Sequence, residues 1–356
     1  MPPLTRQIFS RVLDSWRFRE RVELLMRNRL ANARFSAPRA LPLAPVPYAL
    51  GHAPTASADL PGAGAIFITA RFRTGSTLLW QLFNALPGFM AFYEPLNERH
   101  ATTGGWTATD PSHRGAGDYR LHYARVAPLE HAHAEAWTYD NLCMDEGDFD
   151  PALQGWITRL LGPHDAVPVL QFNRVDFRLR WLRANFPGAH VLHLYRHPRA
   201  QWMSMVGGRP IGPATTLAQF APHDGFYLLA WARDLAHVYP FLRPERHHSP
   251  YALHYLLWRL SYAHGRRHAH QSIAFETLCA DVAGTLGQAL AQTGRAVQPR
   301  DLERLRALVD PPPAERWSEF APAGWFAGIE QACDRLLALA FGNTPDEPSI
   351  GIATRA

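Results

Sequence analysis

The sequence predicts an α/β fold in which a central parallel sheet is flanked by helices. Short apolar runs that fit buried strands lie at 66–68, 167–172 and 190–195. Stretches with helical periodicity stand between them, and strands that alternate with helices are typical of parallel sheets with crossover helices. The chain has 356 residues, 47% of them hydrophobic, which is enough for one large core or two modest ones.

The first 64 residues are expected to lie outside this fold. Residues 1–35 have the pattern of a basic amphipathic helix, with apolar side chains gathered on one side (Ile8, Val12, Trp16, Leu24 and Leu25). Peripheral membrane contact is one role for such a helix, but we favour docking on its own domain or on a partner subunit. Residues 36–64 contain six prolines and are interpreted as an extended linker.

A strand, a loop and a helix follow one another in the stretch 65–96. The loop Arg71–Thr77 comes directly after the strand at 66–68, and the next residues have a helical pattern with Leu78, Leu79, Leu82, Phe83 and Leu86 on one face. A second strand is expected at Phe89–Tyr93. Backbone N–H groups and the positive end of the helix dipole converge at such a loop. The stretch therefore predicts a site for a phosphorylated ligand, with an ordinary strand–turn–helix corner as the alternative.

The residue types in this loop suit an anion. Gly75 has no Cβ and lets backbone approach a phosphate closely. Thr74, Ser76 and Thr77 supply hydroxyl donors, and Arg73 supplies a permanent positive charge in a forked geometry. The loop has no G-x-x-x-x-G-K-[ST] pattern, so it is not a Walker A sequence.

A second loop follows the strand His190–Tyr195. Arg196 stands at the carboxyl end of that strand, Pro198 suits the first turn of a helix, and residues 200–206 are predicted to be helical. Ser204, eight residues after Arg196, faces the same crevice two turns into that helix. A nucleotide-hydrolysing protein would end this strand in a metal-binding Asp. An Arg and a Ser suit a second phosphate without a metal ion.

Together these residues resemble the two cofactor motifs of the PAPS-dependent sulfotransferases. The resemblance spans roughly 65–204 and implies a P-loop-like α/β domain over 65–345 with a hydroxyl-bearing acceptor. It also implies that 3′-phosphoadenosine-5′-phosphosulfate (PAPS) is the nucleotide sulfate donor, held by Arg73, Thr74, Gly75, Ser76, Thr77, Arg196 and Ser204. Arg73-Thr74-Gly75-Ser76 with Tyr93-Glu94-Pro95-Leu96 resembles the carbohydrate 6-O-sulfotransferases and, more loosely, the tyrosylprotein branch. A carbohydrate acceptor is slightly favoured on this ground.

Three residues are the catalytic candidates. Arg73 would neutralise the leaving oxygens. Glu94 is the expected general base, because it follows a strand among apolar neighbours and the same branches point to this Glu; an ion pair with Arg73 or Arg174 is its alternative role. The resemblance to the tyrosylprotein branch makes Arg174 a candidate stabiliser of the sulfuryl group, with a salt bridge to Asp176 or Glu94 as the alternative.

The remaining chain is predicted from pattern alone. An irregular insertion at about 97–148, rich in Gly, His and aromatic residues, would suit an acceptor pocket or pack as a loose subdomain. A strand is expected at 273–275, within a stretch 275–278 (Phe-Glu-Thr-Leu) that resembles the Tyr-Glu-Asp-Leu seen late in many sulfotransferases. Helices are expected at 151–161, 177–186, 226–239, 251–264, 282–293, 301–309 and 326–341. The two at 226–239 and 251–264 are expected to form a lid on the site.

Composition narrows the class of protein. The net charge of +5 could serve a nucleic acid or an anionic membrane surface, but an anionic cofactor and an anionic acceptor explain it equally well. No nucleic-acid partner is expected. Three scattered cysteines predict no disulfide framework, and the eighteen histidines show no zinc pattern. No signal peptide or membrane-spanning run is recognised, and a cytoplasmic location is expected.

Two other functions stay open on the residues alone. A P-loop-type kinase or nucleotidase acting on ATP is disfavoured by the missing Walker lysine and by Arg196 at the end of its strand. A non-catalytic glycan- or anion-binding protein is supported only by the aromatic insertion.

Overall fold

The computed structural model describes residues 62, 64–97, 122–123, 126, 134–295, 297–310 and 316–341. The helix predicted at 1–35 and nearly all of the linker predicted at 36–64 lie outside these residues, as does most of 98–133. The domain boundaries at 35, 64 and 345 therefore stay predictions.

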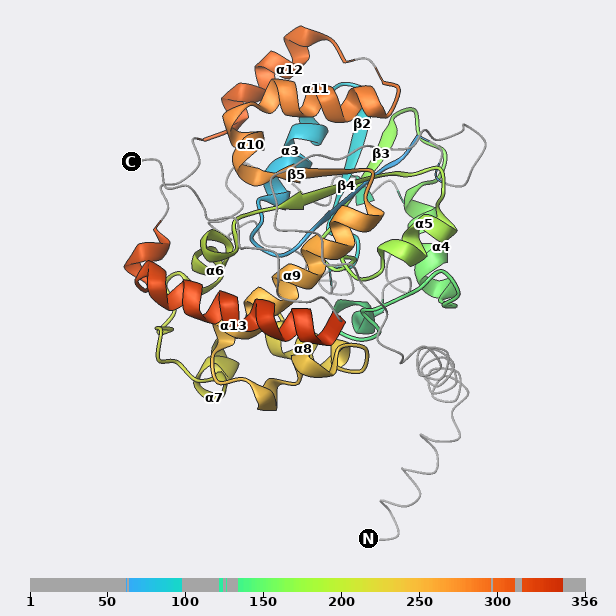
Figure 1. Ribbon diagram of the computed structural model, residues 1–356. Helices are drawn as coiled ribbons and strands as arrows, with labels where there is room; N and C mark the ends of the chain where they lie inside the picture. The colour runs from blue at the N-terminus through green and yellow to red at the C-terminus, as the bar shows by residue number, and fades with distance from the viewer. Residues whose placement is uncertain are drawn as a thin grey trace, which may run out of the picture.

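Five parallel strands form one sheet in the order β2-β3-β1-β4-β5. The central strand β1 (Ile66–Ala70) pairs with β3 (Val167–Phe172) on one side and β4 (His190–Tyr195) on the other. The edges are β2 (Phe89–Tyr93) and β5 (Gln271–Ala274). Helices cover both faces, as Figure 1 shows, and the predicted α/β fold is confirmed.

Alternate residues of β1 face two separate hydrophobic clusters. Ile66 and Ile68 pack in a cluster with α3 (Ser76–Ala85), α10 (Phe275–Ala280), α11 (Val282–Gln292) and α12 (Pro299–Leu305). Phe67 packs on the other face with α4 (Pro151–Leu160) and α5 (Leu179–Asn185). Burial on both faces explains why β1 reads as a continuous apolar run.

A third cluster lies beyond the carboxyl ends of the strands and contains α6 (Pro198–Val206), α8 (Leu228–Leu235), α9 (Pro250–His268) and α13 (Ala323–Phe341). The expectation that α9 is a lid is wrong. Every residue from Leu253 to Gly265 is buried, because α9 packs against β4, β5 and four other helices.

The short elements are α7 (Leu217–Phe220) and the 3₁₀ turns η4 (Glu135–Thr138), η5 (Ala221–His223), η6 (Pro240–Leu242), η7 (Pro244–Arg246), η8 (Arg306–Leu308) and η9 (Trp317–Glu319).

Helix ends follow local capping groups. The Asp150 carboxylate accepts the Leu153 N–H and Pro151 occupies the first turn, which starts α4 where the sequence predicts. The start of α3 differs from expectation, because the helix begins at Ser76 instead of after Thr77. Both hydroxyl residues therefore stand in the first turn, where backbone N–H groups lack intrahelical acceptors.

Three general features concern the part of the chain that the structure describes. Within it, no helix is both long enough and apolar enough to cross a bilayer. The cysteines Cys143, Cys279 and Cys333 are free thiols. Across the same residues, no group of three or more His, Cys, Asp or Glu side chains is arranged to hold a metal ion.

Candidate active site

Two loops meet where the connections of the sheet change direction. From β1 the chain crosses towards β2, at one edge, and from the neighbouring β4 it crosses towards β5, at the other edge. Ligands of open parallel sheets bind at such a switch point, outside the carboxyl ends of the strands. The loop after β1 and the loop after β4 are the two that the sequence predicts to bind phosphate groups.

The first loop presents a backbone shaped for an anion. Arg73 and Gly75 both have left-handed backbone conformations, with φ of 66° and 96°. Gly75 caps α3, and no side chain caps that helix, so its first N–H groups point out of the helix at this turn. A Cβ at Gly75 would lie 2.2 Å from the ring of Phe275, so no side chain fits here. The Thr74 hydroxyl donates to the Arg71 carbonyl and thereby closes the loop.

The second loop contacts the first directly. The Arg73 Nε donates to the Ser204 Oγ at 3.0 Å, and the Arg196 Nη1 donates to the Arg73 carbonyl oxygen at 3.3 Å. Burial lowers the pKa of Arg196, and the nearby Glu276 carboxylate opposes that shift. The structure thus brings together Arg73, Ser204 and Arg196, which are far apart in the sequence.

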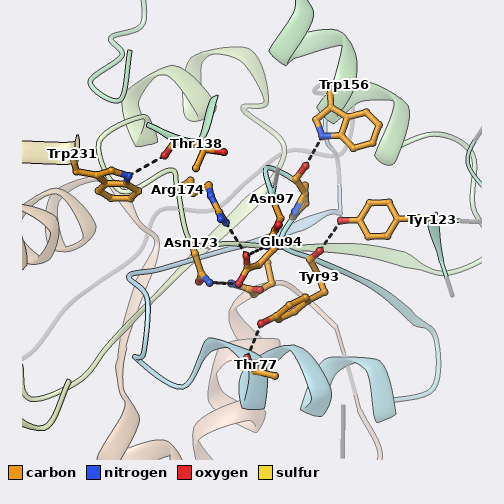
Figure 2. Close-up of polar contacts among 12 residues, drawn as sticks. Thr77, Tyr93, Glu94, Asn97, Tyr123, Thr138, Trp156, Asn173, Arg174 and Trp231 are labelled. Carbon is orange, nitrogen blue, oxygen red and sulfur yellow. Dashed lines mark hydrogen bonds and ion pairs between the residues drawn. The ribbon is translucent and has the colours of Figure 1, made fainter. Parts of the chain in front are cut away.

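Glu94 lies in a buried cluster of N–H donors after β2 (Figure 2). Its Oε2 accepts from Arg174 at 2.8 Å and from Asn97 at 2.6 Å, and its Oε1 accepts from Asn173. The expectation that the Glu94 carboxylate lies in apolar surroundings is therefore wrong. The sequence neighbours of Glu94 are apolar, but its backbone turns with φ of 44° and directs the carboxylate to residues that follow β3.

The turn that carries Glu94 is held from several sides. The Tyr123 hydroxyl donates to the Tyr93 carbonyl at 2.9 Å, and the Trp156 indole donates to the Pro95 carbonyl at 2.9 Å (Figure 2). The Tyr93 hydroxyl lies 2.9 Å from the Thr77 hydroxyl in the first turn of α3. The Glu94 turn is therefore connected to the helix that follows the first loop.

Arg174 is one of several arginines in the site. Of the two salt bridges considered as its alternative role, it forms the one with Glu94, and Asp176 instead lies near Arg71 at 3.7 Å. The neighbouring Arg178 is fully buried and donates to four backbone carbonyls, including that of Arg174. Burial lowers the pKa of Arg178 to about 10. These bonds fix the backbone on which Arg174 stands.

Aromatic rings connect the Arg73 side of the site with the Arg174 side. The guanidinium of Arg73 lies 5.9 Å from the ring centroid of Phe226, and that of Arg174 lies 5.9 Å from Tyr227 and 5.0 Å from Phe72. Phe72 contacts both of the other rings, at 5.7 and 6.1 Å. Tyr227 is the N-cap residue of α8 and has a φ of 59°. The start of α8 therefore borders the site, whereas α9 lies in the core.

The described part of the insertion at 97–148 mostly packs as core. Tyr123 and Trp137 are buried in the cluster around α4 and α5, while Tyr139 is 37% exposed and lies near Tyr227. In the described positions of this segment the one regular element is η4.

Sequence reasoning missed several residues of the site. Asn173 could have been found, since it follows β3 and directly precedes Arg174. Asn97, three residues after Glu94, gave only a turn signal. Nothing in the local pattern marked Gln201, whose amide donates to the Phe72 carbonyl at 2.6 Å, or the pair Phe226 and Tyr227.

The chain was compared with solved structures and with curated proteins. A sulfotransferase from Alicyclobacillus acidocaldarius is 14% identical, with a TM-score of 0.34, and the match covers 78% of this chain and 95% of that one. The sulfotransferase domain of the Synechococcus olefin synthase is 16% identical, with a TM-score of 0.35 and coverages of 77% of this chain and 96% of that one. A sulfotransferase from Mycobacterium tuberculosis is 17% identical, with a TM-score of 0.35 and coverages of 89% of this chain and 87% of that one. No curated protein matches the sequence.

The family assignment rests on a sequence model instead of on these distant structures. The model of the sulfotransferase family matches residues 65–299, well over half of the chain, and this range contains both loops, Glu94 and Arg174. The chain belongs to the sulfotransferase family.

Proposed function

We propose that this protein takes a sulfuryl group from PAPS and transfers it to a hydroxyl group of an acceptor, releasing adenosine 3′,5′-bisphosphate. The observation that carries the proposal is the contact between the two loops, in which the Arg73 Nε donates to the Ser204 Oγ at 3.0 Å. A donor with phosphate groups at both its 5′ and 3′ positions needs two anion sites next to each other. The loops after β1 and β4 offer such a pair.

The donor set fits this co-substrate. The 5′-phosphosulfate would lie at the start of α3, bound by Arg73, Thr74, Gly75, Ser76 and Thr77 with the backbone N–H groups of the turn. The 3′-phosphate would be bound by Arg196 and Ser204. No step in this scheme requires a metal ion, and cations of the chain neutralise the phosphates.

Transfer would proceed in line. The bond between sulfur and the bridging phosphate oxygen breaks while a bond from the acceptor oxygen to sulfur forms, and the hydroxyl proton passes to Glu94. Charge in a loose transition state is spread over peripheral and leaving oxygens, so positioned cations supply most of the catalysis. Arg73 would stabilise the leaving oxygens and Arg174 the sulfuryl oxygens.

A carbohydrate acceptor is slightly favoured. The support is the resemblance of 73–76 and 93–96 to the carbohydrate 6-O-sulfotransferases. A panel of neutral sugars, phenols and tyrosine peptides, each incubated with PAPS, tests this preference by release of the bisphosphate. Faster release with phenols than with sugars would reverse it.

Ligand-dependent melting tests the donor. Adenosine 3′,5′-bisphosphate at about a hundred times its Kd should stabilise the folded protein by about 2.7 kcal/mol and raise its Tm. The shift should be much smaller in Arg196→Ala and persist in Arg300→Ala, a control in which an exposed arginine of α12 is removed. 5′-AMP should give a smaller shift. A shift only with ATP and Mg²⁺ would favour a kinase or nucleotidase instead.

A further inference from the structure

The start of α10 lies between the two phosphate loops. Phe275 is the first residue of α10, and its ring lies so close to Gly75 that a Cβ there would come within 2.2 Å. The same ring contacts the second loop, since the Arg196 guanidinium carbon lies 4.8 Å from its centroid. One side chain therefore contacts both loops.

The backbone around Arg196 is fixed by other groups. The Glu276 Oε1 accepts the His197 N–H at 3.0 Å, and the Trp258 indole donates to the Arg196 carbonyl at 2.9 Å. These two bonds set the position of the turn but do not orient the long arginine side chain. The guanidinium itself contacts the Phe275 ring and the carbonyl oxygen of Arg73.

We propose that Phe275 is a positioning residue, whose ring orients the Arg196 guanidinium for the 3′-phosphate and ties it to the first loop through Gly75. This inference rests on the proposed function. An arginine side chain has many rotamers, and each one that is restricted before binding lowers the entropic cost of gripping a phosphate. A flat ring restricts the guanidinium from one side and attracts its charge. An aliphatic side chain would leave it able to swing away.

Binding measurements on Phe275→Leu test this role. The Kd for adenosine 3′,5′-bisphosphate, measured by titration calorimetry, should rise about tenfold, which corresponds to about 1.4 kcal/mol. The Kd for 5′-AMP, which lacks the 3′-phosphate, should change less than about threefold. Phe275→Tyr keeps the ring and should bind both nucleotides like the wild type. Phe89→Leu is the matched control, since it truncates a phenylalanine packed on the same cluster at the start of β2, and neither Kd should change.

A double-mutant cycle separates positioning from general packing. If Phe275 acts through Arg196, Phe275→Leu should have little further effect in an Arg196→Ala background. An equal loss of affinity for both nucleotides, or an undiminished loss in the Arg196→Ala background, would overturn the inference. If Phe275→Leu does not fold, Phe275→Met, whose longer and more flexible side chain adapts to irregular space, gives the same comparison. A wild type that does not bind the bisphosphate would refute the proposed function itself, whereas normal wild-type binding with an unchanged ratio of the two Kd values would refute only this inference.

Discussion

Replacing Glu94 by Gln should abolish turnover while sparing nucleotide binding. The substitution keeps the size of the side chain and removes its charge. In the wild type the carboxylate accepts bonds from Arg174, Asn97 and Asn173. A glutamine has one oxygen and one NH₂ group, so at least one of these donors would face another donor.

The structure sets the size of two separate effects. The side chains of Arg174 and Glu94 are only 3% and 8% exposed, so the variant leaves a buried guanidinium without its counter-charge. Breaking such a pair costs about 3–5 kcal/mol of folding free energy. Loss of a general base lowers the rate by about 10²- to 10⁴-fold. The first effect lowers Tm and the second lowers kcat.

Three measurements separate these effects. The free energy of unfolding gives the loss in stability, titration with adenosine 3′,5′-bisphosphate gives nucleotide affinity, and kcat per folded molecule gives the chemical step. Tyr123→Phe is the control, because it loosens the same turn at the Tyr93 carbonyl without touching the carboxylate, and its kcat should stay within a few-fold of wild type. If folded Glu94→Gln turns over within tenfold of wild type, Glu94 is not the base and its role is to hold Arg174.

Three further changes follow from the geometry. Gly75→Ala should lose bisphosphate binding and lower Tm, because φ is 96° and the new Cβ would clash with Phe275; a titration with normal affinity would contradict the described loop. Ser204→Ala should weaken bisphosphate binding about tenfold while the free energy of unfolding changes by about 1 kcal/mol or less, since one hydrogen bond is lost; an unchanged Kd would remove Ser204 from the site. Burial lowers the pKa of His193 and His254 from 6.5 to about 3. At pH values between about 3 and 6.5 the unfolded chain therefore binds more protons than the folded chain. Stability should then fall as the pH drops below 6.5, by up to about 1.4 kcal/mol per pH unit for each histidine, and melts from pH 7 to 5 should show a smaller slope in His254→Gln.

Three of the five strands could be predicted closely from the sequence, whereas β1 extends to Ala70 instead of ending at 68 and β5 spans Gln271–Ala274 instead of 273–275. The bounds of β2, β3 and β4 are those expected from pattern, because each is a short apolar run that ends in polar or turn-forming residues. Helices were less predictable. α9 extends from 250 to 268, beyond the expected 251–264, since it is buried on nearly all sides and its apolar pattern gives no clear end.

The residues of the two loops that we propose to bind phosphate could be selected from the sequence because their signal is local. The hydroxyl residues, Gly75 and Arg73 stand together in one turn, and Ser204 is related to Arg196 by helical spacing within one loop and helix. The contact of these loops with Phe275 has no local signal, because it depends on how β5 and α10 are placed against β4.

The surroundings of Glu94 show where reasoning from one sequence ends. The apolar residues next to Glu94 in the chain do not surround its carboxylate, since the backbone turns at Glu94 with φ of 44° and directs the carboxylate to residues that follow β3. Its partner Asn173 lies 79 residues away and comes close because β2 pairs with β3, with Tyr93 opposite Gln171. In a parallel sheet the side chains that meet at one edge are those that follow adjacent strands. The strand order β2-β3-β1-β4-β5 therefore decides that Glu94 meets Arg174 while Arg73 meets Ser204, and this order is a property of the whole chain that no local pattern contains.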